Sequence, residues 1–178
     1  MWLTMTTVNA RAAGSAHIRI DMQQNYFELF QLPVSFDVDT DDLANRHRAI
    51  IARVHPDQFA NKSAMEQRVA LQWATFANEA FDTLKTPLTR AQYLLKLNAP
   101  ELVIEGVRVN LPPEFLMQQM MWREALEDGQ ADAVRAEVAQ LHASTLAQLA
   151  DECGENDWDA VALTLAKCQF IENFMGQL

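Results

Sequence analysis

The spacing of apolar residues constrains the fold of this chain more than any other feature of its sequence. In long segments these residues recur at intervals of three and four, which places them on one face of an α-helix. The 178 residues include only 5 Gly and 6 Pro, too few for the many turns of a β-sandwich. Because 49% of the residues are apolar, the chain can bury a core. We therefore expect an all-α protein.

The first helical module is expected over residues 24–98. Side chains that cap helix N-termini indicate where its two long helices begin: Asp39 and Thr40 for one, and Ser63, with Glu66 three residues later, for the other. The first long helix must end before Pro56, because a residue that precedes proline is pushed out of the helical region. The apolar face of the second long helix consists of Met65, Val69, Trp73, Phe76, Ala80 and Leu84. The expected plan is a long antiparallel pair, joined by a loop and flanked by two short helices.

The loop between the two long helices, residues 55–62, contains the tripeptide His55-Pro56-Asp57. A His–Asp pair can act as a general base, but a hydrolase also needs a nucleophile or a bound water. The loop provides no Ser or Cys before Ser63, the expected cap, and one His with one Asp is too few for a zinc site. The proline fixes the backbone, so we expect the loop to present both side chains to a partner. A small hydrolase that uses them stays open as an alternative.

Motifs on both sides of this tripeptide resemble those of a J domain. Tyr26-Phe27 precedes it, Asn78 begins an N-x-A-F-x-x-L motif, and Pro87 begins a P-x-x-R-A-x-Y motif, so the resemblance covers residues 26–93. It implies a co-chaperone that docks on a DnaK-class chaperone and stimulates its ATP hydrolysis. The implied stimulating triplet consists of His55, Pro56 and Asp57.

The helix before the tripeptide carries three arginines. Arg46 and Arg53 are seven residues apart, which places them on one stripe, whereas Arg48 projects from another side. In a chain with a net charge of −10, this cationic edge can steer docking onto an acidic chaperone surface. We interpret all three as chaperone-binding residues, with simple solvation of the helix as the alternative. Gln58, directly after the triplet, stands where many J domains carry Lys.

A second module, a three-helix bundle, is expected over residues 112–178, after a linker at residues 99–111 that has no helical period. The expected helices span 112–129, 131–153, with Gly154 as the stop, and a last segment capped by Asn156 or Asp157. Residues 24–99 carry 8 basic and 9 acidic side chains, whereas residues 100–178 carry 4 and 14. The acidity is therefore concentrated in the second half of the chain.

The first bundle helix carries more apolar surface than a bundle core needs. At 100° per residue, Phe115, Trp122 and Leu126 form its core face. The opposite side is also apolar and consists of Leu116, Met117, Met120 and Met121. Thioether side chains adapt their shape, which suits a surface that binds a partner. The last helix has a similar surplus stripe of Leu163, Phe170 and Phe174. The alternative for both stripes is packing against the rest of the protein.

A J domain followed by an acidic helical bundle, without a Gly/Phe-rich segment or zinc-binding cysteines, resembles the HscB family. That family consists of co-chaperones of iron–sulfur cluster assembly, and the resemblance spans residues 24–178. It implies an L-shaped protein that is not an enzyme, docks on an HscA-type chaperone and binds an IscU-type scaffold protein. The implied scaffold contacts are Leu116, Met117, Met120, Glu124 and Phe170. The alternative is a general J-domain co-chaperone whose bundle holds unfolded clients.

The same resemblance implies no cofactor for this chain, because ATP and the cluster belong to its partners. Cys153 and Cys168 form no CxxC motif, so we expect two buried thiols and no metal site. The negative charge argues against binding to nucleic acid or an anionic membrane, and no apolar run reaches the roughly 18 residues of a membrane span. Residues 1–23 are expected to be a disordered extension. The expected location is the bacterial cytoplasm, with the mitochondrial matrix as the alternative.

Overall fold

The computed structural model describes residues 24–103 and 111–178, and within these ranges every regular element is a helix. The elements are α1 (Tyr26–Leu29), α2 (Thr40–Val54), α3 (Pro56–Phe59), α4 (Ala64–Lys85), α5 (Pro87–Asn98), the 3-10 turn η1 (Pro100–Val103), α6 (Pro113–Glu127), α7 (Ala131–Glu155) and α8 (Trp158–Met175). The expected all-α fold is confirmed. The extension expected at residues 1–23 and most of the expected linker lie outside the described residues.

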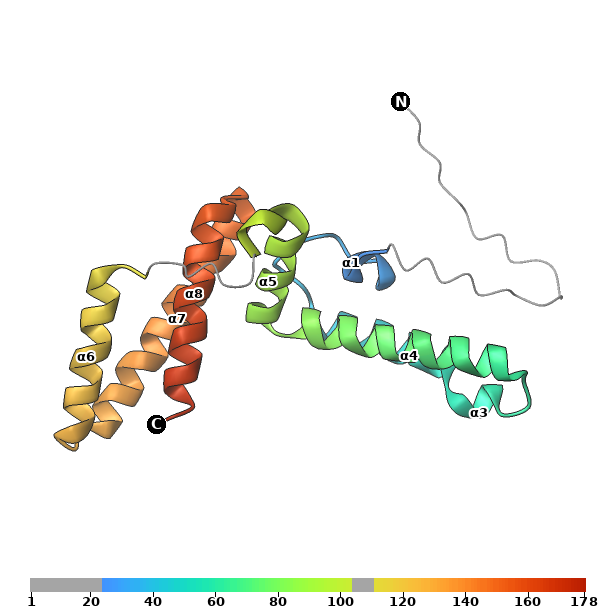
Figure 1. Cartoon of the computed structure of the whole chain (residues 1–178), viewed down its shortest axis with the longest axis horizontal. Helices are drawn as coiled ribbons and strands as arrows, with labels where there is room; N and C mark the ends of the chain where they lie inside the picture. The colour runs from blue at the N-terminus through green and yellow to red at the C-terminus, as the bar shows by residue number, and fades with distance from the viewer. Residues whose placement is uncertain (1–23, 104–110) are drawn as a thin grey trace, which may run out of the picture.

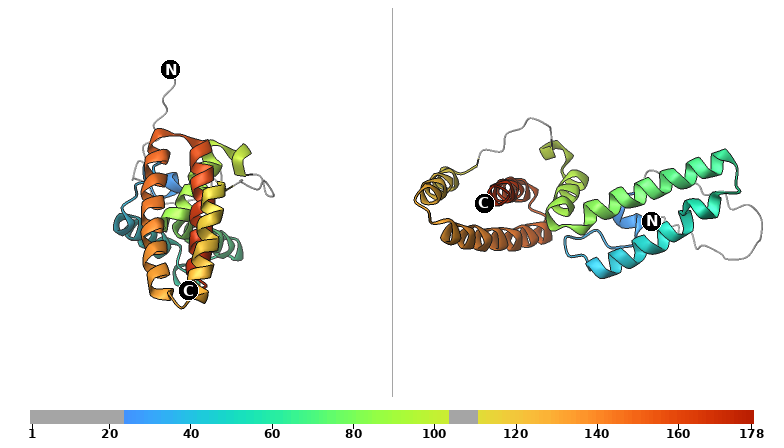
Figure 2. Two further views of the ribbon diagram at one scale, coloured as in Figure 1. Left: turned by 90° about the vertical axis from the view of Figure 1, so that its left-hand side faces the viewer. Right: turned by 90° about the horizontal axis from the view of Figure 1, so that it is seen from below.

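The helices form two arms that meet at α5 (Figure 1). One arm is the antiparallel pair of α2 and α4, with α3 at its far end. The other arm is the bundle of α6, α7 and α8, whose helices run steeply across the direction of α4 in Figure 1 and stand upright in the left panel of Figure 2. The L shape implied by the family resemblance is therefore confirmed.

Capping side chains fix the N-termini of α2 and α4 where the sequence predicts them. The Asp39 side chain accepts hydrogen bonds from the two acidic residues of the first turn of α2, and Ser63 forms a reciprocal capping box with Glu66 at the start of α4. The prediction for the end of α7 is wrong: Gly154 stays helical, and the helix ends at Asn156, whose φ is 59°. Asparagine tolerates this left-handed conformation, so it terminates the helix as glycine often does.

The apolar face of α4 differs from the predicted one at its beginning. Met65 is exposed, because the first turn of α4 lies beside the one-turn helix α3 and beyond the end of α2. Farther along, three alanines, Ala70, Ala77 and Ala80, are buried together with Leu84. Alanine has almost no side chain, so α2 and α4 can approach closely along their contact.

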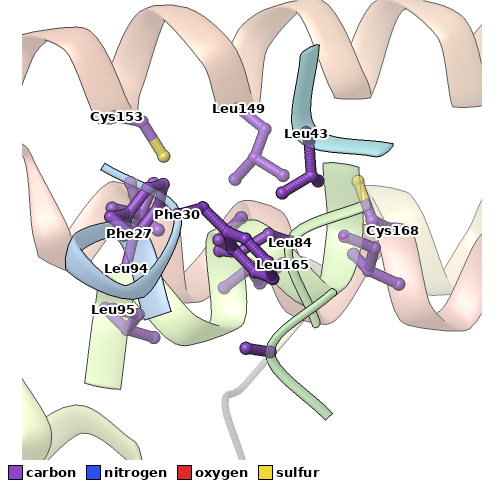
Figure 3. Close-up of a cluster of buried hydrophobic side chains, with 14 of the residues drawn as sticks. Phe27, Phe30, Leu43, Leu84, Leu94, Leu95, Leu149, Cys153, Leu165 and Cys168 are labelled. Carbon is purple, nitrogen blue, oxygen red and sulfur yellow. The ribbon is translucent and has the colours of Figure 1, made fainter. Parts of the chain in front are cut away.

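One hydrophobic core joins the two arms. Phe27 of α1, Phe30 directly after it and Leu43 of α2 share a cluster with Leu149 of α7 and Leu165 of α8 (Figure 3). Helix α5 lies between them and contributes Leu88, Ala91, Leu94 and Leu95. A second, smaller cluster fills the rest of the bundle with Trp122, Val134, Val138, Ile171 and Phe174. The arms are thus held to one another by side-chain packing, and the boundaries at 24–98, 99–111 and 112–178 stay a prediction.

Motif residues that flank the tripeptide have structural roles near this junction. The Tyr93 hydroxyl accepts a hydrogen bond from the Tyr26 backbone N–H at 2.9 Å, and the two rings are stacked with centroids 4.3 Å apart. The buried Arg90 donates to the carbonyl oxygens of Leu84 at 2.7 Å and Phe36 at 2.6 Å. Because the last carbonyls of a helix lack intrahelical partners, Arg90 satisfies one at the end of α4. Burial lowers the pKa of this guanidinium.

Candidate functional site

The tripeptide lies at the far end of the first arm, between α2 and α4 (Figure 1). The expected loop contains a helical turn, α3, because Pro56 occupies its first position, where a missing N–H costs nothing. His55 caps this turn. Its Nδ1 accepts the backbone N–H of Asp57 at 3.3 Å, and its carbonyl accepts the N–H of Gln58 at 3.0 Å. A neutral imidazole that accepts at Nδ1 carries its proton on Nε2, so the ring is left with one N–H donor at Nε2.

The His55 and Asp57 side chains of the triplet are both accessible to a partner. The side chain of His55 is 52% exposed and that of Asp57 is 91% exposed, with 3.5 Å between Nδ1 and the nearer carboxylate oxygen. That separation is longer than an ordinary hydrogen bond, so the carboxylate keeps its acceptor capacity. The tip therefore offers a donor on His55 and an acceptor on Asp57, fixed to one short turn.

Two glutamine side chains hold this tip in place: Gln58, which the sequence analysis noted only as a departure from the usual Lys, and Gln67, which it did not mention. The amide nitrogen of Gln58 donates to the carbonyl of Ala52 at 2.9 Å, which ties α3 to the last turn of α2. The amide nitrogen of Gln67 lies 3.1–3.3 Å from three carbonyl oxygens, those of Phe59, Ala60 and Lys62. These side-chain contacts with backbone carbonyls do not follow the helical period, so the spacing of residues in the sequence could not have revealed them.

The three arginines of α2 are not equivalent. Arg46 is anchored: its Nε lies 2.8 Å from Asp42, and one terminal nitrogen donates to the carbonyl of Phe30 at 2.9 Å. Arg48 donates to the Asn45 side chain at 2.6 Å and remains on the exposed surface. Within residues 24–103 and 111–178, Arg53 has no hydrogen-bond or ion-pair partner. Arg53 is therefore a cation beside the triplet that is free to meet a partner.

The triplet lies apart from three clefts in the described part of the chain. Three clefts of about 530–780 Å³ lie at the junction of the arms and between α6 and α7, and neither His55 nor Asp57 lines any of them. In the part of the chain that the structure describes, no group of three or more His, Cys, Asp or Glu side chains is arranged to hold a metal ion. The side chains of the triplet face solvent instead.

The second exposed feature is one face of α6. Trp122 is buried, and Phe115 and Leu126 pack against the bundle core, as predicted. On the other side, Leu116 is 46% exposed, Met117 64%, Met120 71% and Met121 58%. We call these four residues the α6 face. The interpretation that they pack against the rest of the protein is therefore wrong, and this apolar surface is open to solvent.

Of the two remaining residues of the predicted scaffold site, Glu124 lies beside the α6 face and Phe170 packs on the core side of α6. Glu124 is exposed one turn after Met120 and Met121. Phe170, on α8, is half-buried, with its ring edge-to-face against Phe115 at 5.7 Å between centroids. The structure thus brings Phe170 to α6 through Phe115, and part of its ring serves the bundle core.

The two cysteines are free and buried, as predicted. Burial raises the pKa of each thiol to about 11, with Glu152 near Cys153 and Glu172 near Cys168 adding to the effect. Such thiols are neutral at physiological pH and contribute to the core as small apolar groups. Among the described residues, no helix has the length and hydropathy of a membrane span.

Comparisons with known proteins give one consistent result. Residues 111–178 match a family described as the HSCB C-terminal oligomerisation domain. The chain is 39% identical over 169 residues to the co-chaperone protein HscB homolog of Azoarcus sp. (strain BH72), with 89% of this chain and 94% of that protein covered. It is 41% identical over 162 residues to the homolog of Bordetella pertussis (strain Tohama I), with 86% and 94% covered.

Solved structures agree with the sequence relatives. Chaperone HscB from Vibrio cholerae superposes with a TM-score of 0.74 at 37% identity, and the match covers 86% of this chain and 94% of that one. Human co-chaperone protein HscB gives a TM-score of 0.77 at 25% identity, covering 88% and 81%. These relatives are co-chaperones and not enzymes, so the hydrolase interpretation of His55 and Asp57 is wrong. The exposed tripeptide, the two-armed fold and this similarity over most of the chain lead to one conclusion: the chain belongs to the HscB family of co-chaperones.

Proposed function

We propose that this chain stimulates the ATPase of an HscA-type DnaK-class chaperone and delivers an IscU-type scaffold protein to it during iron–sulfur cluster assembly and transfer. The observation that carries this proposal is the separation of two exposed features. The triplet lies at the far end of one arm, and the α6 face lies on the other arm (Figure 1). Two partners can therefore be bound at the same time without competing for surface.

The J-type module, residues 24–98, engages the chaperone through the triplet. The Nε2 proton of His55 is available as a donor, and the exposed carboxylate of Asp57 is available as an acceptor. Arg53 and Arg48 add exposed positive charge, which favours encounter with an acidic surface. Arg46 contributes its charge from a fixed position, because it also binds carbonyls of the segment after α1.

The bundle, residues 112–178, binds the scaffold through the α6 face. Leu116, Met117 and Met120 provide an adaptable apolar surface, and exposed apolar patches of this kind mark protein-binding sites. Glu124 supplies a charged rim, and the accessible part of Phe170 extends the surface toward α8. An apolar centre with a polar rim is the usual anatomy of a protein interface.

Joining both sites in one chain raises the local concentration of scaffold at the chaperone. The shared core at α5 strengthens this effect, because side-chain packing holds the two arms together. ATP hydrolysis by the chaperone then tightens its hold on the delivered scaffold. ATP and the cluster belong to the partners in this scheme, and the bacterial cytoplasm is its proposed location.

The test is steady-state ATP hydrolysis by a purified HscA-type chaperone. We expect stimulation by this chain alone and a further, more than additive increase when the IscU-type scaffold is present. Absence of stimulation would contradict the chaperone half of the proposal. A pull-down from cell extract tests the other half: one small folded scaffold supports it, whereas a heterogeneous set of unfolded proteins would favour a general J-domain co-chaperone.

A further inference from the structure

The α6 face concentrates thioether sulfur at the protein surface. Met117, Met120 and Met121 lie within one helical turn of one another, and each is more than half exposed. Residues three and four apart on a helix are neighbours, so the three sulfur atoms belong to one continuous patch. An oxidant that reaches this face meets all three.

The thiols of the chain are protected from the same oxidant. Peroxide reacts with the thiolate form of cysteine, and thiols that are buried in apolar surroundings react slowly. Cys153 and Cys168 are buried, and each pKa is raised to about 11. At pH 7 roughly one thiol in ten thousand is then ionised. Peroxide therefore has easier access to the exposed thioethers than to the buried thiols.

We propose that the α6 face is a site of reversible methionine oxidation by hydrogen peroxide and that its oxidation releases the scaffold. The second half rests on the function proposed above. In each event the O–O bond of the peroxide breaks, one oxygen atom forms an S–O bond with the thioether, and water leaves. The sulfur loses two electrons and the peroxide gains them. A methionine sulfoxide reductase, with a dithiol as electron donor, reverses the step.

The physical reason for release is the change in polarity. A sulfoxide is a strong hydrogen-bond acceptor, and burying a polar group without a partner opposes docking. The fold itself should persist, because the three side chains contribute little to the bundle core, which Trp122 fills from the opposite side of α6. The triplet contains no sulfur, so its action on the chaperone should be unaffected.

Peptide mass spectrometry after graded treatment of the whole chain with hydrogen peroxide tests the modification directly. We expect sulfoxide on Met117, Met120 and Met121 before any oxidation of the cysteines, and unchanged helical circular dichroism. Oxidation of Cys153 or Cys168 ahead of these methionines would overturn the proposed site. This measurement needs no partner, so it is independent of the proposed function.

Calorimetric titration with the purified IscU-type scaffold tests the consequence. Affinity should fall about tenfold or more after oxidation and recover after treatment with both methionine sulfoxide reductases. Stimulation of the chaperone without scaffold should stay unchanged. The variant Met65→Leu, which removes an exposed methionine of α4 outside the α6 face, should be equally sensitive. Unchanged affinity with the sulfoxides in place would overturn the inference, whereas an untreated chain that does not bind scaffold would contradict the proposed function.

Discussion

The tip of α3 and the α6 face are both exposed, but they are built in opposite ways. At the tip, proline, a capping imidazole and two glutamine amides fix a few polar atoms in one arrangement. On α6, four flexible apolar side chains project into solvent, and the opposite face of the helix packs against the bundle core. The tip presents polar atoms at fixed positions, whereas the α6 face presents an apolar surface area.

This difference predicts different tolerance to mutation. A site that depends on single donors and acceptors should lose function when one atom moves, even if polarity is kept. A site that depends on apolar area should lose affinity in proportion to the area removed. Substitutions in the two arms can therefore test whether each site works as its construction indicates.

The largest effect is expected for His55→Gln. The flexible amide side chain can still offer an N–H, but it does not keep both the Nδ1 cap on Asp57 and the position of the Nε2 donor. We expect nearly complete loss of chaperone ATPase stimulation with an unchanged fold, because His55 lies outside the core. Steady-state ATPase assays and circular dichroism check this.

A matched control for this variant is His142→Gln. His142 lies on α7, where its ring is 3.3 Å from Glu172, far from the tip. The same chemical change at this position should leave stimulation at the wild-type level. Equal loss in both variants would show that the tip has no special role, and wild-type stimulation by His55→Gln would remove the J-type assignment of this module.

The next largest effect is expected for Leu116→Ala combined with Met120→Ala. Truncation of side chains at the centre of an interface often costs about 1–2 kcal/mol each, so scaffold affinity should fall by roughly 30- to 700-fold if the two costs add. Calorimetry measures this directly. The control is Leu71→Ala with Met65→Ala, which removes the same two side-chain types from exposed positions on α4. If both double variants bind the scaffold equally well, the α6 face is not the scaffold-binding site.

The sequence predicts those parts of both sites that depend on neighbours along the chain. The capping residues Asp39 and Ser63 give the starts of α2 and α4, and the spacing on α6 separates the buried Trp122 from the exposed methionines. These features arise from local hydrogen bonds and from the helical period. Both can be read from a short stretch of sequence.

The features that the sequence does not predict depend on contacts between distant segments. Spacing places Arg46 on the same stripe as Arg53, but the carbonyl of Phe30, which engages Arg46, comes from a different part of the chain. The period of α5 identifies its apolar face without revealing that α7 and α8 cover it. A hydrophobic stripe shows that a side chain will be buried, but it does not show against what.

A smaller effect is expected for Arg46→Gln, and it concerns stability. The Arg46 guanidinium donates hydrogen bonds to the carbonyls of Phe30 and Gln31 and forms an ion pair with Asp42. Loss of these bonds should lower the free energy of unfolding by about 1–2 kcal/mol, as measured by urea denaturation. Arg53→Gln is the matched control and should change stability by less than about 0.5 kcal/mol. Equal stability of the two variants would mean that Arg46 does not anchor the segment after α1.

The smallest effect is expected for Arg53→Gln, and it concerns the rate of encounter. This guanidinium is exposed beside the tip, so it should act through long-range attraction and not through a fixed contact. We expect association with the chaperone to slow by about 2- to 5-fold at low salt, and the difference to vanish near 1 M salt, where the screening length is about 3 Å. Stopped-flow measurements at several salt concentrations check this, with Arg135→Gln on α7 as the control in the other arm. A defect that persists at high salt would assign Arg53 to a direct contact, and the fixed part of the chaperone site would then extend beyond the triplet into α2.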